Sequence, residues 1–298
     1  MSGFLNLHKP AGLTSHDCVA RVRRRLGLKR VGHGGTLDPA ATGVLPIAVG
    51  RATRLLQFLP EGKAYRAVVR FGVRTDTDDL EGEVLATTVA PELTLEAVAS
   101  HLAAFQGTLQ QIPPKYSAIQ VGGKRLYDLA RAGEPVEVPV RQVVVYSTKV
   151  LGWTPGDFPE LTVAIACGSG TYIRAIARDL GEQLGVGGTL AALERTESGG
   201  FNLDGSIALD AVSPEALISP AIALAHLPAV ALDAEQAVDW GHGRPVVIEA
   251  PLSSAGSSNY VRVLGAEAFL GVAQMAAQDR NIQDGGVRLV PKVVWSAA

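Results

Sequence analysis

The 298-residue chain has little cysteine, few aromatic residues and no long apolar run. Its two cysteines, Cys18 and Cys167, are too few for a disulfide framework, and neither has the spacing of a zinc ligand. We therefore expect buried reduced thiols and no metal site. No stretch of about 18 apolar residues occurs, so no membrane-spanning helix is expected. The apolar run at residues 4–7 is too short for a signal peptide, which favours a cytoplasmic protein.

The net charge of -2 hides an uneven distribution of charge along the chain. Residues 1–70 contain twelve lysines and arginines but only three acidic residues, so the remainder of the chain is acidic. A basic segment on an acidic chain indicates a polyanionic partner bound on one face. A solvated helical face, or ion pairing with the acidic remainder, would account for the same charges.

Periodicity and turn residues predict a mixed α/β protein with a strand-rich main sheet and a small β-rich tail. Ser15 and Thr94 are expected to be helix N-caps, and the glycine-rich segment 31–43 is expected to be a loop. The expected helices are 15–28, 94–105 and 171–184, and the expected strands are 44–49, 64–72, 143–151 and 160–167. The stretch 107–142, rich in glycine, proline and basic residues, is expected to be a functional loop.

The strongest local signal for chemistry is the loop sequence HGGTLDP at 33–39. Its Asp38 carboxylate follows a basic helix and is well placed to act on an anionic substrate. A structural role remains open, because Asp-Pro is a good helix start with Asp38 as N-cap and Pro39 at the first helical position. His33, likewise, could be a core or turn histidine.

Two other motifs place aromatic and basic side chains together. The sequence GSGTYIR at 168–174 brings Tyr172 and Arg174, suited to stacking on a base and pairing with a carboxylate, or else forms a plain strand-to-helix turn. Tyr65 in KAYR stands next to cations and is either a base-stacking residue or an ordinary strand aromatic. The acidic run at 76–79 lacks EF-hand spacing and is interpreted as a solvated turn.

These motifs resemble those of the TruB-type bacterial tRNA pseudouridine synthases. The block GHGGTLDPAATGVLPIAVGRATR at 32–54 is similar to the signature of that family. Further similar blocks occur in the family's order over nearly all of the first 225 residues, at 5–17, 63–84, 112–133 and 167–185. The resemblance implies an isomerase that converts the T-loop uridine of tRNA (position 55) to pseudouridine without a cofactor.

The resemblance also implies roles for individual residues. Asp38 matches the catalytic aspartate, Tyr65 an active-site tyrosine that stacks on the target base, and Arg174 the arginine that pairs with the aspartate. The Arg174 charge is expected to keep Asp38 ionised by lowering its pKa. The residues implied to be substrate-binding are His33, Tyr172, Leu193 and Lys9. Of these, His33 would enter the T-loop, Leu193 would line the base pocket and Lys9 would support the loop.

Two domains are expected. Residues 1–226 would form an α+β catalytic domain on a mixed, mainly antiparallel sheet flanked by helices, with 107–142 as an RNA-gripping insert. Residues 227–298 resemble a small PUA-like β-rich domain, although five basic against seven acidic residues suit RNA binding poorly. No heptad pattern or exposed apolar stripe is visible, so a monomer is expected.

Three other functions are consistent with parts of the sequence. A non-catalytic RNA-binding protein or tRNA chaperone would use the same basic face without Asp38. A synthase acting on rRNA within a guided ribonucleoprotein would be expected to have long basic extensions, and a small-molecule phosphate-binding enzyme would need more complete glycine motifs. The presence of Asp38, Tyr65 and Arg174 together favours the tRNA-modifying enzyme.

Overall fold

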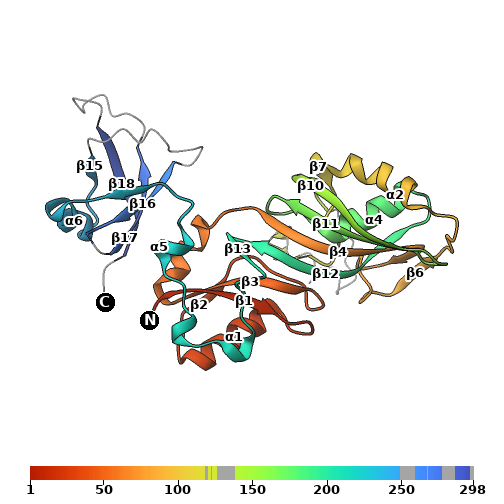
Figure 1. Ribbon diagram of the computed structural model, residues 1–298, viewed down its shortest axis with the longest axis horizontal. Helices are drawn as coiled ribbons and strands as arrows, with labels where there is room; N and C mark the ends of the chain where they lie inside the picture. The colour runs from red at the N-terminus through yellow and green to blue at the C-terminus, as the bar shows by residue number, and fades with distance from the viewer. Residues whose placement is uncertain are drawn as a thin grey trace.

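The computed structural model describes residues 1–117, 120–121, 123–125, 138–248, 259–266, 268–276 and 286–295. Within these ranges, a large sheet and a small sheet form two units that stand side by side along the long axis of the molecule (Figure 1). None of the helices found there combines the length and apolar character needed to cross a membrane.

The larger sheet has nine strands in the order β1-β3-β12-β4-β11-β10-β7, with β2 paired to β3 and β13 to β12. Only the pairing of β12 with β3 is parallel, which confirms a mixed, mainly antiparallel sheet. Its strands are β1 (Gly3–Lys9), β2 (Val31–His33), β3 (Thr42–Val49), β4 (Lys63–Phe71), β7 (Gly107–Gln111), β10 (Arg141–Thr154), β11 (Glu160–Cys167), β12 (Gly188–Ser198) and β13 (Phe201–Asn202). Two hairpins pair β5 (Val73–Thr75) with β6 (Val84–Thr87) and β8 (Gln120–Val121) with β9 (Lys124–Arg125).

Helices cover different parts of this sheet. The helix α4 (Ile173–Gln183) and the helix α2 (Leu95–Leu102) pack on the half formed by β4, β10, β11 and β12 (Figure 1). The helix α1 (Ser15–Leu26) packs its apolar side on β1 and β3. Alternation along β4 buries Tyr65 and Phe71 beneath α4, whereas Arg66 and Arg70 project from the other face. Short helical segments are η1 (Gly50–Phe58), η2 (Ala103–Phe105), η3 (Leu209–Ala211), η4 (Pro214–Ala216) and α5 (Pro220–Ala223).

The smaller unit has its own core around the buried Trp240. Its strands lie in the order β14-β16-β17-β18-β15, and the helix α6 (Ala234–Gly241) packs against them. The strands are β14 (Ala229–Ala231), β15 (Val246–Ile248), β16 (Tyr260–Leu264), β17 (Phe269–Met275) and β18 (Val287–Val294). An apolar cluster joins the two units, and in it the rings of Phe58 and Tyr260 lie 5.1 Å apart.

Most predicted elements are confirmed, but four details were wrong. The expected loop 107–142 begins with strand β7 and ends with the first two residues of β10, because these two ends pair in the large sheet. The N-cap of α1 is Thr14 and not Ser15, because Thr14 accepts from the amide of Asp17 while the Asp17 carboxylate accepts from the amide of Thr14. The predicted loop 31–43 contains strand β2 at its start and the first residues of β3 at its end. No helix follows Asp38, so that residue is not a helix cap.

Candidate active site

A fully buried lysine holds the loop that carries Asp38 through hydrogen bonds to its backbone. Lys9, the last residue of β1, donates hydrogen bonds from Nζ to the backbone oxygens of Pro10, Pro39 and Ala41 at 2.9, 3.0 and 2.7 Å. Burial lowers the pKa of Lys9, although the Asp38 charge opposes this. All three ammonium protons therefore have protein acceptors, which is consistent with the expected role of Lys9 in supporting the loop.

Two further side chains hold the residues that precede Asp38. Ser15 Oγ at the start of α1 accepts from the amide of Leu37 at 2.9 Å and donates to the Leu37 oxygen at 3.2 Å. Arg195 of β12 is fully buried, and its guanidinium donates to the backbone oxygens of Val44, Thr36 and Gly35 at 2.7, 3.3 and 3.1 Å. Side chains from β1, α1 and β12 therefore hold the loop through hydrogen bonds. None of these hydrogen bonds involves the Asp38 carboxylate.

Gly43 allows the end of this loop to lie directly against β12. It pairs with Arg195 in the single parallel pairing of the large sheet, with a φ of 101°. A Cβ atom at this position would lie 2.2 Å from the Arg195 backbone oxygen. Only glycine satisfies both the positive φ and the close approach of the two backbones.

The Asp38 carboxylate pairs with Arg174 of α4, with 3.1 Å between Oδ2 and Nε. Arg174 is buried, whereas the Asp38 side chain is 41% exposed and so remains accessible from the site. Burial raises the pKa of Asp38, and Asp79 adds to this; Arg174 and Lys9 act in the opposite direction without reversing it. Arg174 thus lowers the pKa of Asp38 as expected, while desolvation sets the net direction upward.

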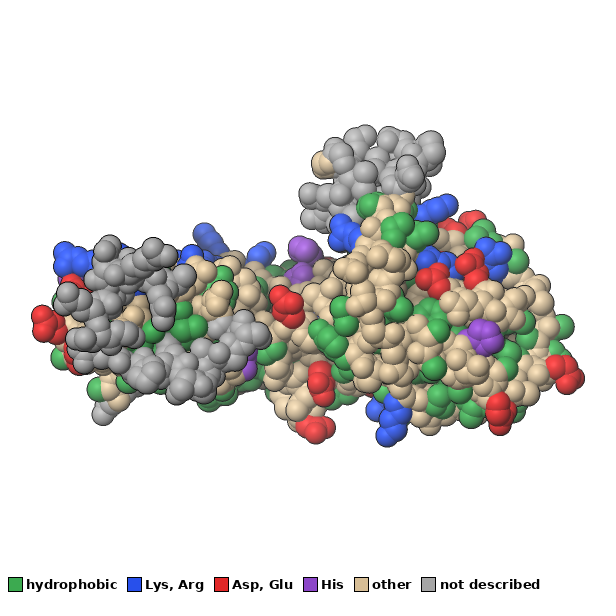
Figure 2. Space-filling view, turned by 90° about the horizontal axis from the view of Figure 1, so that it is seen from above, with side chains coloured by type: hydrophobic (Ala, Val, Ile, Leu, Met, Phe, Trp, Pro, Cys, Tyr) green, Lys and Arg blue, Asp and Glu red, His purple; other side chains and the backbone are tan. Residues whose placement is uncertain are grey.

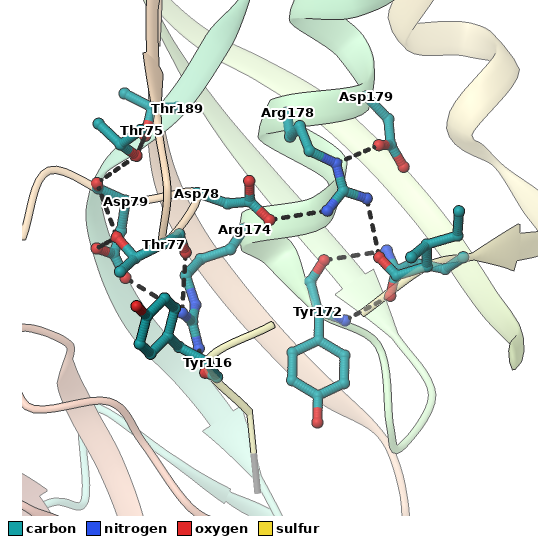
Figure 3. Close-up of polar contacts among 12 residues, drawn as sticks. Thr75, Thr77, Asp78, Asp79, Tyr116, Tyr172, Arg174, Arg178, Asp179 and Thr189 are labelled. Atoms are coloured by element: carbon teal, nitrogen blue, oxygen red, sulfur yellow. Dashed lines mark hydrogen bonds and ion pairs between the residues drawn. The ribbon is translucent and has the colours of Figure 1, made fainter. Parts of the chain in front are cut away.

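Arg174 has three other partners besides Asp38. Its Nη1 lies 3.3 Å from Asp79 Oδ2 and donates to the backbone oxygen of Thr77 at 3.0 Å, and its Nη2 donates to the backbone oxygen of Tyr116 at 3.1 Å (Figure 3). The Asp79 side chain is only 16% exposed. The interpretation of residues 76–79 as a solvated acidic turn was therefore wrong, because the turn packs against α4 and binds its arginine.

The remaining residues implied for the site come from three elements: Tyr65 from β4, Leu193 from β12 and Tyr172 from the position before α4. Tyr65 is buried on β4, and Leu193 on β12 packs against the core cluster that contains it. Burial raises the pKa of Tyr65, the positive charge of Arg195 opposes the shift, and the Asp38 charge adds to it. Tyr172 precedes α4 and exchanges two backbone hydrogen bonds with the side chain of Gln111, and its ring projects away from the polar network (Figure 3).

His33 lies on β2 and is part-buried, with no described contact to Asp38. Its ring packs edge-on against His16 of α1, with centroids 5.4 Å apart at 81°. Its Nδ1 atom is buried without a hydrogen-bond partner. Burial lowers the pKa of His33, and the neighbouring His16 charge acts in the same direction, so the neutral ring is favoured.

Apart from Lys9, sequence reasoning missed the residues that hold the site in place. Arg195 had no local signal, because it follows Glu194 in the polar stretch ERTES at 194–198, where an arginine is expected to face solvent. Ser15 was assigned to helix capping and Asp79 to solvent. Both cysteines are buried as predicted, and the described residues contain no group of three or more metal-ligating side chains.

Comparison with known proteins gives matches over both units. A family model described as TruB family pseudouridylate synthase (N terminal domain) matches residues 23–173, and one described as Pseudouridine synthase II TruB, C-terminal, matches residues 228–294. The tRNA pseudouridine synthase B of Microcystis aeruginosa is 55% identical over 296 residues, which cover 99% of each chain. The protein of the same name from Trichormus variabilis is 58% identical over 283 residues, covering 92% of this chain and 95% of that one.

Solved structures show the same fold. A chain in a Cbf5-Nop10-Gar1 complex matches with a TM-score of 0.73 and 25% identity over 98% of this chain and 84% of that one. A chain in an H/ACA RNP bound to a substrate RNA containing 2'-deoxyuridine matches with a TM-score of 0.72, 24% identity and coverage of 99% and 85%. Together with the family matches, these similarities show that the chain belongs to the TruB family of pseudouridylate synthases and is an isomerase.

Proposed function

We propose that this enzyme converts the T-loop uridine of tRNA to pseudouridine, with Asp38 as its catalytic carboxylate. The observation that carries the proposal is the Asp38 carboxylate itself. The carboxylate takes no part in the hydrogen bonds that hold the loop, and it is part exposed. Its Oδ2 lies 3.1 Å from Arg174 Nε. The relatives named tRNA pseudouridine synthase B support tRNA as the substrate.

The reaction exchanges one glycosidic bond for another. The C1′–N1 bond breaks with its electron pair going to uracil, the base rotates, and a C5–C1′ bond forms. C5 then loses its proton to solvent and N1 gains one. The target base must first leave its stack, which costs a few kcal/mol that contacts in the pocket offset.

Two routes through the bond cleavage are consistent with the site. In one, the Asp38 carboxylate bonds to C1′ and is later released when C5 attacks. In the other, Asp38 stabilises positive charge on the sugar while a base takes a proton from C2′ and returns it when C5 bonds to C1′, a role that Tyr65 would take. In both, Arg174 fixes the carboxylate, the Tyr65 ring stacks on uracil, and Leu193 and Tyr172 line the pocket.

A basic surface supports RNA as the partner. Lysine and arginine side chains lie along one edge of the molecule in Figure 2, with histidines among them. On α1, Arg21, Arg24 and Arg25 line a hollow of about 410 Å³ together with Leu209 and Asp210. We propose that these arginines meet phosphates of the tRNA and that His33 enters the T-loop. Because folded RNA is recognised mainly by shape and backbone, such contacts suit a T-arm.

We further propose that residues 1–226 form the catalytic domain and residues 227–298 a PUA-like domain. The described part of the insert 107–142 bonds to α4 next to the site, which supports a role in gripping RNA. Residues 118–119, 122 and 126–137 of that insert, including Arg131, lie outside the described residues. A monomer acting in the cytoplasm stays a prediction.

Tritium release from tRNA transcripts labelled at uridine C5 tests the proposal. The wild-type chain is expected to release tritium, and both Asp38→Asn and replacement of the T-loop uridine by cytidine should abolish release. Tight tRNA binding without any release would instead establish a non-catalytic RNA-binding protein. Release that persists in Asp38→Asn would overturn the assignment of the catalytic carboxylate.

A further inference from the structure

Arg178 makes a second set of contacts on α4, one helical turn beyond Arg174. Its Nη1 donates to Asp78 Oδ2, its Nε to Asp179 Oδ1 and its Nη2 to the backbone oxygen of Ile112, each at 2.8 Å (Figure 3). The Arg178 side chain is 21% exposed, and that of Asp78 only 12%. A part-buried guanidinium with three fixed partners is held in one orientation, although the proposed reaction does not use it.

The two arginines hold the turn 77–79 through three consecutive residues. Thr77 and Asp79 bind Arg174, and Asp78 between them binds Arg178. Asp78 has a φ of 63°, which makes it the one non-glycine residue in the left-handed region among the described residues. L-residues rarely adopt this conformation, so it persists where the surroundings enforce it.

The same two arginines also hold the beginning of the insert. The backbone oxygen of Ile112 accepts from Arg178, and that of Tyr116 accepts from Arg174. Arg174 alone also pairs with Asp38. Arg178 therefore holds the same two segments as Arg174 and makes no described contact with the catalytic carboxylate.

We propose that Arg178 is a positioning residue for the isomerisation. Through Asp78 it fixes the turn 77–79, and through Ile112 it fixes the start of the insert, so that Arg174 presents its Nε to Asp38. The inference rests on the proposed function, because its effect is measured on pseudouridine formation. The simpler alternative is an ion pair that stabilises the fold and leaves the geometry at Asp38 unchanged.

The test compares Arg178→Met and Asp78→Asn with wild type in single-turnover pseudouridine formation at saturating tRNA transcript. We expect the rate to fall roughly 10- to 100-fold in each variant, because a displacement of about 1 Å at a reacting group can cost that much. The tRNA Kd should change much less than the rate. Both substitutions disrupt the same contact between Arg178 and Asp78. The double variant should therefore be no slower than the slower of the two single variants.

Arg70→Met is the matched control. Arg70 of β4 pairs with Glu160 through the same kind of part-buried ion pair, at 2.7 Å, on the sheet face opposite Tyr65. This variant should lower the melting temperature but leave the single-turnover rate of the folded protein unchanged. A purely stabilising Arg178 would behave in the same way.

The outcomes separate the two proposals. Folded Arg178→Met with a wild-type rate, or an equal loss of rate in Arg70→Met, would overturn the positioning role. If Arg178→Met does not fold, Asp78→Asn decides, because it leaves α4 unaltered and asparagine tolerates a positive φ. An inactive wild type would instead reject the proposed function, and this inference with it.

Discussion

Replacing the buried Lys9 by methionine should loosen the loop that carries Asp38 and slow the proposed reaction. Methionine has nearly the length of lysine but no donor. The three backbone oxygens of Pro10, Pro39 and Ala41 would therefore lose their common partner. The oxygen of Ala41 accepts in a buried bond, whereas the other two bonds are part-buried and open to replacement by water.

The expected loss of stability follows from these differences. A hydrogen bond to a charged donor contributes about 1.5–3 kcal/mol when it is buried, and the part-buried pair contributes about 0.5–1.5 kcal/mol each. Removing a buried charge returns part of its desolvation cost. We therefore expect the free energy of unfolding to fall by about 2–4 kcal/mol. The turnover rate should fall by roughly 10- to 100-fold, because the loop that carries Asp38 is no longer fixed.

Urea unfolding and tritium release at saturating tRNA measure the two effects. Lys149→Met is the control, because Lys149 is exposed on β10 and the chemical change is identical. A Lys9→Met protein with a loss below about 1 kcal/mol and a wild-type rate would refute the reasoning. Ser15 and Arg195 would then be sufficient to hold the loop.

Two other predictions concern the same site, and a third concerns the basic surface of α1. Asp38→Asn should be more stable than wild type at neutral pH, because the folded state raises the pKa of Asp38. Urea unfolding measures the difference in free energy of unfolding between the two proteins. This difference should disappear as the pH falls through the raised pKa of Asp38 towards 3.8, because the wild-type carboxylate then takes up a proton. Gly43→Ala should lower the melting temperature and cost more than about 2 kcal/mol, since its Cβ would meet the Arg195 oxygen at a positive φ. Arg24→Ala should reduce the slope of log Kd against log salt for tRNA by slightly less than about one unit, measured by filter binding, if Arg24 neutralises one phosphate.

Local signals in the sequence predicted most of the elements, with one failure at the start of α1. The strand 160–167 and the helix cap Thr94 follow from alternation and from hydrogen bonds that span a few residues, and both are confirmed. The N-cap of α1 failed by one residue because Thr14 and Asp17 form a capping box that was not recognised. Because Thr14 caps the helix, the Ser15 hydroxyl is available to hydrogen-bond the backbone of Leu37. Assigning the cap to Ser15 therefore concealed its role in holding the loop.

The contacts across the site were beyond local reasoning. Asp78 and Arg178 are separated by 100 positions in the chain, and Arg195 lies about 160 positions from the loop it holds. An acidic run such as 76–79 looks the same in sequence whether it faces water or a helix that carries arginines. The resemblance to a family identified Asp38 and Arg174 as a pair, but the pattern of residues that hold them came only from the fold.

The charge balance at Asp38 explains why an ion pair does not keep its pKa low. Arg174 divides its single positive charge between Asp38 and Asp79, at 3.1 and 3.3 Å. The Asp79 charge acts against ionisation of Asp38, in the same direction as desolvation and opposite to Arg174. Contacts with two carboxylates and two backbone oxygens hold Arg174 in one orientation, which defines the geometry at Asp38.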